Sequence, residues 1–263
     1  YWKNIYSNGV KKLQLPYDRL GINKNSFDAD CIPILLSHEQ IDQLISFSRK
    51  NSTSVYNIML TAFKLTLAKY SQCEEIIVGV PVQNRPDSRW KYTTGFFVNT
   101  LPIKSEFSLR ENFLDILQTV QNNCLSAYEH QSCPFFDIQK YAMSKNANQS
   151  VNLQAFFSYQ DVQNRSGKFN QIKYHQINVS NLSAHTDLDL WVKFSETKVE
   201  GGLHFKKDLF DKSTVENMLE YYLHIIDQCL VSPNCPINQI QLPLNQKNKL
   251  IDWGKGPVLD NLE

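Results

Sequence analysis

Four stretches of the chain carry apolar residues at the three- and four-residue spacing of an amphipathic helix. Three of them open with a capping box, in which a serine is followed three residues later by Gln or Glu. The boxes begin at Ser37, Ser108 and Ser213. The pattern therefore predicts three helices that start just after these serines, and a fourth helix over residues 55–70.

Between these helices lie segments rich in β-branched and aromatic residues, which favour strands. They cover residues 75–82, 96–103, 153–160, 173–180, 188–195 and 199–206. A short polar link joins the last two segments and predicts a hairpin, whereas the polar, turn-rich residues 161–170 predict a loop. Strands interleaved with long helices predict an α/β (α+β) layered sandwich, with helices packed on one mixed sheet.

Two of these strands are unusual because each pairs an apolar run with polar groups. Residues 76–82 precede Gln83, Asn84 and Arg85, and the predicted core run 96–98 precedes Asn99 and Thr100. Pro81 has no amide donor, so its end of the strand is expected at the rim of the sheet. Polar side chains at strand ends are suited to a binding or catalytic site.

Composition narrows the function classes. The 263 residues carry a net charge of +1, so bulk charge favours neither nucleic acid nor an anionic membrane. No apolar run approaches the roughly 20 residues that span a bilayer. The six cysteines form no Cys-x-x-Cys pair, which favours reduced structural thiols and a cytoplasmic chain. His130 and Cys133 have metal-like spacing but lack a second pair, so no metal site is expected.

Six segments in the right order resemble the condensation domains of nonribosomal peptide synthetases. One segment, Val78-Gly-Val-Pro81-Val-Gln-Asn-Arg85, is similar to the family pattern Ile-Gly-x-Pro-x-x-x-Arg. A second segment, from Gly95 to Lys104, is similar to the family pattern Gly-x-Phe-Val-Asn-Thr-Leu-Pro-x-Arg/Lys. The others are Tyr1-Trp2 with Leu13 to Arg19, His130 to Phe135, Phe157 to Gln160, and Asp208 to Asp211 with the closing stretch from Leu242 to Trp253.

The family's catalytic pattern His-His-x-x-x-Asp-Gly does not occur in the sequence. In the family it precedes the Tyr-Trp segment with which this chain opens. The resemblance therefore implies the C-terminal half of a condensation domain, a chloramphenicol-acetyltransferase-like subdomain over residues 1–243. Residues 244–263 would then start a linker toward a following domain, expected to be an adenylation domain.

The resemblance also implies a reaction and a set of partners. An acceptor amine would attack a donor acyl thioester, both carried on phosphopantetheine arms of carrier proteins, and no cofactor would be bound directly. The N-terminal half would supply the catalytic His. Arg85 would pair with an Asp of that half, and Asn99 would support the site beside it. Thr100, Ser158 and Gln160 would line the substrate tunnel, with backbone capping as an equal alternative for Asn99 and Thr100.

Two other functions stay open at this point. His185 and Asp189 satisfy the His-x-x-x-Asp spacing of the wider acyltransferase superfamily, so His185 could be the base of a stand-alone enzyme. Leu190 stands where that pattern expects Gly, and period-two alternation from Leu188 onward favours a plain strand. The other alternative is a non-catalytic half-domain that docks carrier proteins.

Overall fold

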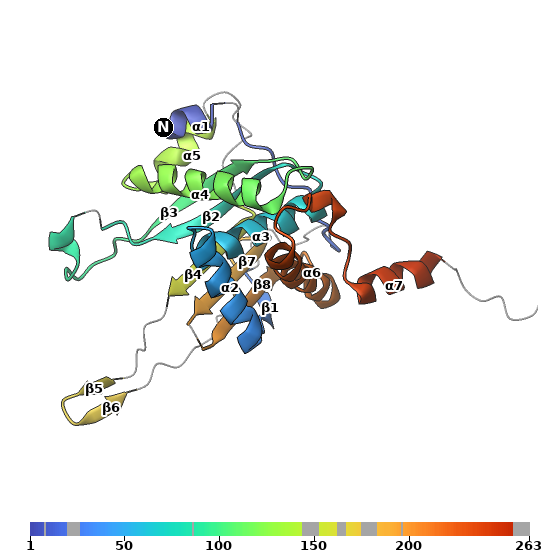
Figure 1. Cartoon of the computed structure of the whole chain (residues 1–263). Helices are drawn as coiled ribbons and strands as arrows, with labels where there is room; N and C mark the ends of the chain where they lie inside the picture. Colours follow the sequence, from blue (N-terminus) through green and yellow to red (C-terminus); the bar gives the residue numbers. More distant parts are fainter. Residues whose placement is uncertain are drawn as a thin grey trace, which may run out of the picture.

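A six-stranded mixed sheet forms the centre of the molecule in the computed structural model (Figure 1), which describes residues 1–7, 9–19, 27–85, 87–143, 153–161, 167–174, 183–195 and 197–254. The strand order is β1-β8-β7-β4-β2-β3. Its strands are β1 (Ala29–Pro33), β2 (Glu75–Val82), β3 (Asn99–Glu106), β4 (Ala155–Asp161), β7 (Leu188–Phe194) and β8 (Val199–Lys206). The central strand β4 runs parallel to β2 and β7, and the outer pairs are antiparallel.

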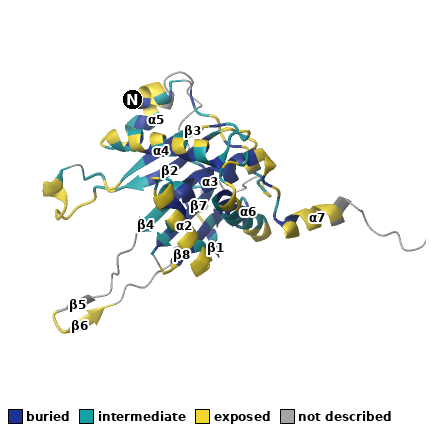
Figure 2. Ribbon diagram, viewed as in Figure 1, coloured by how far each residue is buried: buried dark blue, intermediate teal, exposed yellow. Residues whose placement is uncertain are grey.

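Four long helices pack on one face of this sheet: α2 (His38–Lys50), α3 (Val55–Ser71), α4 (Phe113–Glu129) and α6 (Lys212–Val231). The short α1 (Trp2–Ile5) contacts α5 (Phe135–Met143), which lies against β3. Burial is deepest where α3 and α6 meet the sheet (Figure 2). The 3-10 helix η2 (Ile237–Gln239) and then α7 (Leu244–Gly254) follow α6. No helix in the described part of the chain is long and apolar enough to cross a membrane.

The central helix α3 is buried almost all round, and it carries a lysine into the core. Lys64 is fully buried, and its Nζ donates to the carbonyls of Ile103 (2.6 Å) and Ile76 (3.3 Å) and to Ser105 Oγ (3.1 Å). Asn123 of α4 donates to the same Ser105 Oγ at 3.2 Å. Burial lowers the pKa of Lys64 to about 7. The amine thus links α3, both strands of the β2–β3 pair and α4.

The predicted architecture is confirmed, and most strand bounds agree. Residues 75–82 and 199–206 form strands with the predicted bounds, and 188–194 pairs with 199–205 as the expected antiparallel hairpin. The predicted Pro81 position also holds in part. β2 is an inner strand, between β4 and β3. It pairs with β4 only at Gly79, however, so the end of β2 that carries Pro81 has no paired residue on the β4 side. All six cysteines are free thiols.

Two of the three predicted capping boxes are wrong. Ser37 and Gln40 form theirs as expected at the start of α2. α4 instead begins at Phe113, where the Asn112 side chain accepts from the Asp115 amide. The Ser108 hydroxyl donates instead to the Glu74 carboxylate at 3.0 Å.

The start of α6 is capped from a distant part of the sequence. The helix begins at Lys212, so Ser213 lies inside it. Asp18 accepts from the Asp211 amide (2.7 Å) and from the Thr214 hydroxyl (2.9 Å). Arg19 forms an ion pair with Asp211 beside this cap. A carboxylate 193 residues upstream therefore anchors the N-cap residue and the first turn of α6.

The predicted core run 96–98 is the largest error. Phe96 is 92% exposed and Val98 50% exposed, and β3 begins only at Asn99. Residues 87–98, called the arm below, instead leave the sheet between β2 and β3 and contain the 3-10 helix η1 (Ser88–Trp90). Figure 1 shows the arm projecting from the ends of these two strands.

The predicted loop 161–170 is also partly wrong, because Gly167–Phe169 forms strand β5, which pairs with β6 (Ile172–Tyr174). Of the predicted strand 173–180, residues 173 and 174 belong to β6, and residues 175–180 lie outside the described residues.

Candidate functional site

The sheet brings the three predicted tunnel residues to one face. Thr100 of β3 pairs with Pro81 of β2. Gly79, two residues before Pro81 on β2, pairs with Phe156 of β4. Because strand side chains alternate, residues two apart share a face. The residues on this face include Thr100, Ser158 and Gln160.

This face is the one that the long helices leave uncovered. Phe157, between Phe156 and Ser158, is buried against Phe63 and Tyr56 of α3. The alternate positions therefore point to the opposite side, where Trp191 and Lys193 of β7 are half-buried beside Ser158 and Gln160. We call this side the polar face of the sheet.

Asn99 points the other way from Thr100, and all of its hydrogen-bonding groups are used. Its Nδ2 donates to the carbonyls of Gln131 and Cys133, both at 2.8 Å, and its Oδ1 accepts from the Phe135 amide at 3.2 Å. The side chain therefore caps the turn between α4 and α5. This geometry supports the backbone-capping alternative for Asn99.

The N-terminal residues of the chain pack against this same turn between α4 and α5. Trp2 Nε1 donates to the His130 carbonyl at 3.0 Å, and the Tyr1 ring stacks on the His130 ring at 4.2 Å. Tyr6, fully buried, donates to the Pro102 carbonyl at 2.6 Å. We call this cluster, with Asn99, the α1–β3 junction. Three segments of the family resemblance thus meet in one largely buried structural unit.

A second unit ties the segment 13–19 to the sheet. Gln154 accepts from the Leu13 amide (2.7 Å) and donates to the Leu13 carbonyl (3.0 Å) and the Tyr17 hydroxyl (2.7 Å). Tyr17 in turn donates to Asp187 Oδ2 at 2.7 Å. Asp187 is therefore held by a tyrosine and by Lys206 at 3.7 Å.

Arg85 lies at the base of the arm and is bound to it. Both of its described hydrogen bonds use Nη1, which donates to the carbonyls of Trp90 and, at 2.8 Å, Thr93. The guanidinium carbon stands 4.0 Å from the centre of the Phe97 ring, and Trp90 packs on that ring at 5.9 Å. Among the described residues, no hydrogen bond uses the Nε or Nη2 atom.

The arm carries aromatic side chains into solvent. Tyr92 is 87% exposed and Phe96 92% exposed, and Trp90 is 40% exposed. The sequence pattern does not indicate this surface, because the apolar residues after Gly95 resemble a buried strand. The polar, charged stretch from Asp87 to Thr94 was the signal that the chain had left the sheet.

His185 does not form a catalytic pair in this structure. It is exposed on the bend before β7, and its described contact is the Phe27 ring at 5.2 Å. No carboxylate among the described residues hydrogen-bonds to it, and Asp187 is engaged by Tyr17. The geometry gives the stand-alone acyltransferase little support.

The polar face carries a titratable row that the sequence analysis did not single out. Asp189 of β7 stands opposite His204 of β8, and His204 stands opposite Cys31 of β1. Burial raises the pKa of Asp189 to about 6 and lowers that of His204. The period-two pattern of the predicted hairpin could have indicated Asp189 and His204, since it places both on the side away from Leu190. Cys31 lies on β1, where the sequence pattern predicted no strand.

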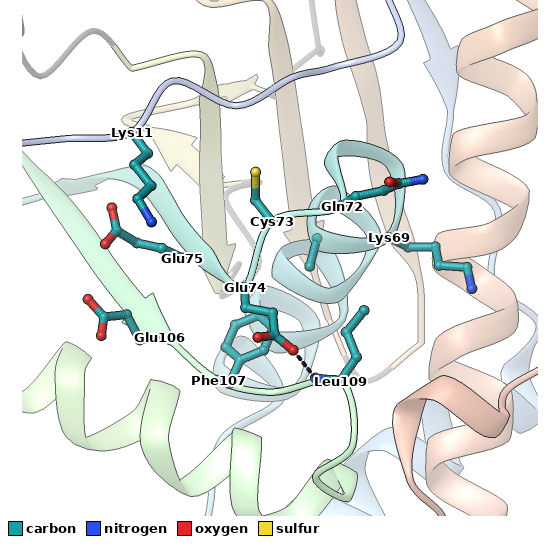
Figure 3. Close-up of a pocket in the computed structure, with 10 residues that line it drawn as sticks. Lys11, Lys69, Gln72, Cys73, Glu74, Glu75, Glu106, Phe107 and Leu109 are labelled. Atoms are coloured by element: carbon teal, nitrogen blue, oxygen red, sulfur yellow. Dashed lines mark hydrogen bonds between the residues drawn. The ribbon is translucent and has the colours of Figure 1, made fainter.

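One cavity among the described residues lies away from all these side chains. Its volume is about 790 Å³, and Lys11, Glu74, Glu75 and Glu106 line it (Figure 3). Glu75 and Glu106 pair at the opposite end of the β2–β3 ladder from Val82 and Asn99. Its carboxylates have partners, since Lys104 bridges Glu75 (3.0 Å) and Glu106 (2.8 Å), and Glu74 accepts from the Leu109 amide (3.0 Å). Chemistry, rather than cavity size, therefore directs attention to the polar face and the arm. In the described part of the chain, no three His, Cys, Asp or Glu side chains are grouped as a metal site.

Comparison with known proteins identifies the family. The family model of the condensation domain matches residues 1–251. Tyrocidine synthase 3 of Brevibacillus parabrevis is 28% identical over 92% of this chain and 4% of its own length. Gramicidin S synthase 2 of Brevibacillus brevis is 27% identical over 95% of this chain and 6% of its own length. The chain therefore spans only a small part of the curated relatives that it matches.

Solved structures share the fold. The condensation domain of the Monacolin K polyketide synthase MokA superposes with a TM-score of 0.75 at 19% identity, over 90% of this chain and 57% of that one. The four-domain nonribosomal peptide synthetase holo-AB3403 gives 0.79 at 18% identity, over 94% of this chain and 20% of that one. With the match of the family model over nearly the whole sequence, this chain belongs to the condensation domain family.

Proposed function

We propose that this chain is the C-terminal half of a condensation domain that joins carrier-bound acyl or peptidyl and aminoacyl thioesters through an amide bond. The observation that carries the proposal is its coverage of solved relatives. The chain aligns over 90% of its own length with a condensation domain of which it covers only 57%. The N-terminal half, with its His-His-x-x-x-Asp-Gly motif, would lie in the part of such a domain that these residues do not cover.

The reaction assigns different work to the two halves. The acceptor amine must be neutral and close to the donor thioester carbonyl, and the tetrahedral oxyanion needs hydrogen-bond donors. The motif His of the N-terminal half would position or deprotonate the amine. The polar face, with Thr100, Ser158 and Gln160, would form a wall for the two phosphopantetheine arms. This half alone is therefore expected to be inactive.

Arg85 would orient the catalytic loop by pairing with the motif Asp of the N-terminal half. A guanidinium suits this task because its planar fork matches a carboxylate. The Nε–Nη2 edge, which makes no hydrogen bond to any described residue, supports this role. Asn99 would act indirectly, through the turn that it caps.

The exposed aromatic residues of the arm support a partner surface. Side chains as apolar as Phe96, at 92% exposure, are rarely left to solvent without a binding role when several gather on one projection. The N-terminal half is the partner that we assign to the arm. Donor and acceptor carrier proteins would dock on the assembled domain, and α7 would lead toward an adenylation domain in a cytoplasmic synthetase.

A complementation assay tests this proposal. The chain is mixed with a separately expressed N-terminal half-domain that carries the His-His-x-x-x-Asp-Gly motif, and amide formation between carrier-bound donor and acceptor thioesters is measured. We expect product only when both halves are present, and a loss of about tenfold or more with Arg85→Ala. Arg49→Ala, at the exposed end of α2, is the matched control.

The same assay separates the two alternatives. A non-catalytic docking half-domain would bind carrier proteins but give no product with any N-terminal half. A stand-alone acyltransferase would give product without the second half, and His185→Ala would abolish it.

A further inference from the structure

We propose that Asp189 and Trp191 form a binding site for the side-chain ammonium group of a basic, lysine-type substrate. The two residues lie two positions apart on β7, so both side chains stand on the polar face of the sheet. Binding of an ammonium group at this place does not depend on the proposed function. Only the assignment of that ammonium group to a substrate of the condensation reaction rests on it.

The carboxylate of Asp189 is buried without an internal partner. Its Oδ1 atom is shielded from solvent and has no hydrogen-bond partner among the described residues. His204 stands opposite on β8, but no hydrogen bond joins the two described side chains. Burial raises the pKa of Asp189 to about 6, so most of the carboxyl is ionised at pH 7.5. A buried charge without a partner is costly, and a cation bound beside it offsets part of that cost.

The lysines of β7 and β8 on this face are engaged by other carboxylates. Lys206 Nζ stands 3.7 Å from Asp187, and Lys193 Nζ stands 3.7 Å from Glu200. Burial, rather than a neighbouring charge, sets the pKa of Asp189. Among the described residues of these two strands, Asp189 therefore contributes a negative charge that no lysine balances.

The indole of Trp191 supplies an aromatic surface on the same face. Trp191 is half-buried, and its neighbours across the sheet are small, with Ser158 on β4 and Gly202 on β8. Neither is large enough to cover the ring, and no aromatic ring in the described part of the chain packs on it. Tryptophan attracts cations more strongly than the other aromatic side chains. A carboxylate and an indole on one face thus match an ammonium group on an apolar stem.

The residue opposite Asp189 on β4 leaves the carboxylate accessible. That residue is Phe156, and a Cβ on Gly79 of β2 would stand only 2.7 Å from its ring. The ring therefore leans over β2 and away from Asp189. Because Asp189 is half-buried rather than fully enclosed, a ligand can reach it from the polar face.

The site suits an ammonium group that does not react. The amine that attacks a thioester must be neutral, whereas a nearby carboxylate stabilises the protonated form of an amine. Asp189 would therefore hold a reacting α-amine in its unreactive state. The ammonium group of a lysine-type side chain has an ordinary pKa of about 10.4, so it stays charged at neutral pH and can be held while chemistry proceeds elsewhere.

The first test uses the chain alone at pH 7.5 with three small probes. Nα-acetyl-lysine methylamide carries a side-chain ammonium group, Nα-acetyl-norleucine methylamide is its neutral counterpart, and alanine methylamide carries only an α-ammonium group. Binding is followed by NMR at the backbone amides of β7. We expect the lysine probe to bind about tenfold or more tightly than either of the others. Equal binding of the norleucine probe or of the alanine probe would overturn the inference.

Matched variants locate the binding. Asp189→Asn should weaken binding of the lysine probe by about tenfold or more, because an amide cannot balance its charge. Trp191→Leu should weaken it by about threefold. Asp42→Asn, which changes an exposed carboxylate on α2, should bind like the unchanged chain. Asp189→Asn should also raise the midpoint of thermal unfolding at pH 7.5, because it removes a buried charge; this shows that the variant folds. Lysine-probe binding that is indifferent to Asp189→Asn would contradict the inference.

The second test uses the chain assembled with an N-terminal half-domain. A lysyl or a norleucyl residue is carried first on the donor and then on the acceptor thioester, and amide formation is measured. We expect the lysyl substrate to be preferred by about tenfold in one of the two positions, and this preference to fall below about twofold in Asp189→Asn. Product without a lysyl preference in either position would contradict the assignment to a substrate. No product from any pair of substrates would instead contradict the proposed function, while ammonium binding by the chain alone would still stand.

Discussion

The α1–β3 junction and the arm both adjoin the start of β3, yet the polar and aromatic side chains are buried in the junction and exposed in the arm. In the junction, Trp2 and Tyr6 are buried and donate to backbone carbonyls, and Asn99 uses all of its hydrogen-bonding groups. In the arm, Tyr92 and Phe96 are almost fully exposed, and at its base Arg85 keeps one edge without a partner among the described residues.

This difference separates segments of the family resemblance that hold the folded chain together from those that face outward. Buried polar groups with every partner internal contribute to stability and are insensitive to a second chain. Exposed aromatic rings contribute little to the stability of the chain that carries them. Substitutions in the junction should therefore unfold the chain, and substitutions in the arm should leave it folded but unable to dock.

The largest effect is expected in the junction. Asn99→Leu leaves the carbonyls of Gln131 and Cys133 and the amide of Phe135 without their partner. We expect a loss of about 2–3 kcal/mol in the free energy of unfolding, measured by urea denaturation. Thr100→Val, one residue along on the polar face, is the control and should change stability by less than about 0.5 kcal/mol. Equal losses for both variants would remove the distinction between the two sides of β3.

The buried amine of Lys64 should make stability depend on pH. Its pKa is about 7 in the folded chain and near the ordinary 10.5 when unfolded, so the unfolded state binds more protons between these values. The free energy of unfolding should therefore rise from pH 7 to 8.5, by up to about 1.4 kcal/mol per pH unit from this group. Lys64→Met should flatten that slope. An unchanged slope in Lys64→Met would mean that the amine stays charged in the core.

A smaller effect is expected at the start of α6. Asp18→Ala removes the acceptor for the Asp211 amide and the Thr214 hydroxyl. Loss of these two hydrogen bonds to a carboxylate at the surface should cost about 1 kcal/mol, which thermal unfolding can resolve. Ser213→Ala should have almost no effect, since Ser213 lies inside the helix rather than at its cap. The reverse ranking would restore the capping box that the sequence predicted.

The smallest effect on stability is expected in the arm. The double variant Tyr92→Ser, Phe96→Ser removes two exposed rings and should change the free energy of unfolding by less than about 0.5 kcal/mol. Docking to the N-terminal half should weaken by about tenfold or more, measured by titration calorimetry. Unchanged docking would show that the arm faces something other than that half.

Alternation and local capping predicted the interior of the fold well. The period-two pattern placed Ser158 and Gln160 on one face, and the box at Ser37 gave the start of α2. Contacts between residues far apart in sequence could not be predicted in this way. Asp18 binds the N-cap amide of α6 from 193 residues away, and no local sequence pattern indicates that contact.

Burial of single residues was the other limit. Lys64 lies within an otherwise apolar helix, and only the sheet carbonyls and Ser105 explain how its amine is accommodated. Phe96 was misplaced for the opposite reason, because an apolar residue beside a strand is usually buried. At the candidate site, the sequence indicated Arg85, but its contacts with Trp90, Thr93 and Phe97 depend on how the arm folds back.

The most direct test of the account is amide formation from carrier-bound donor and acceptor thioesters by this chain, with and without an N-terminal half-domain that carries the His-His-x-x-x-Asp-Gly motif. We expect no product from the chain alone, product from the two halves together, and loss of that product with Arg85→Ala while Arg49→Ala retains it. Product from the chain alone, or product from the two halves that is indifferent to Arg85, would contradict it.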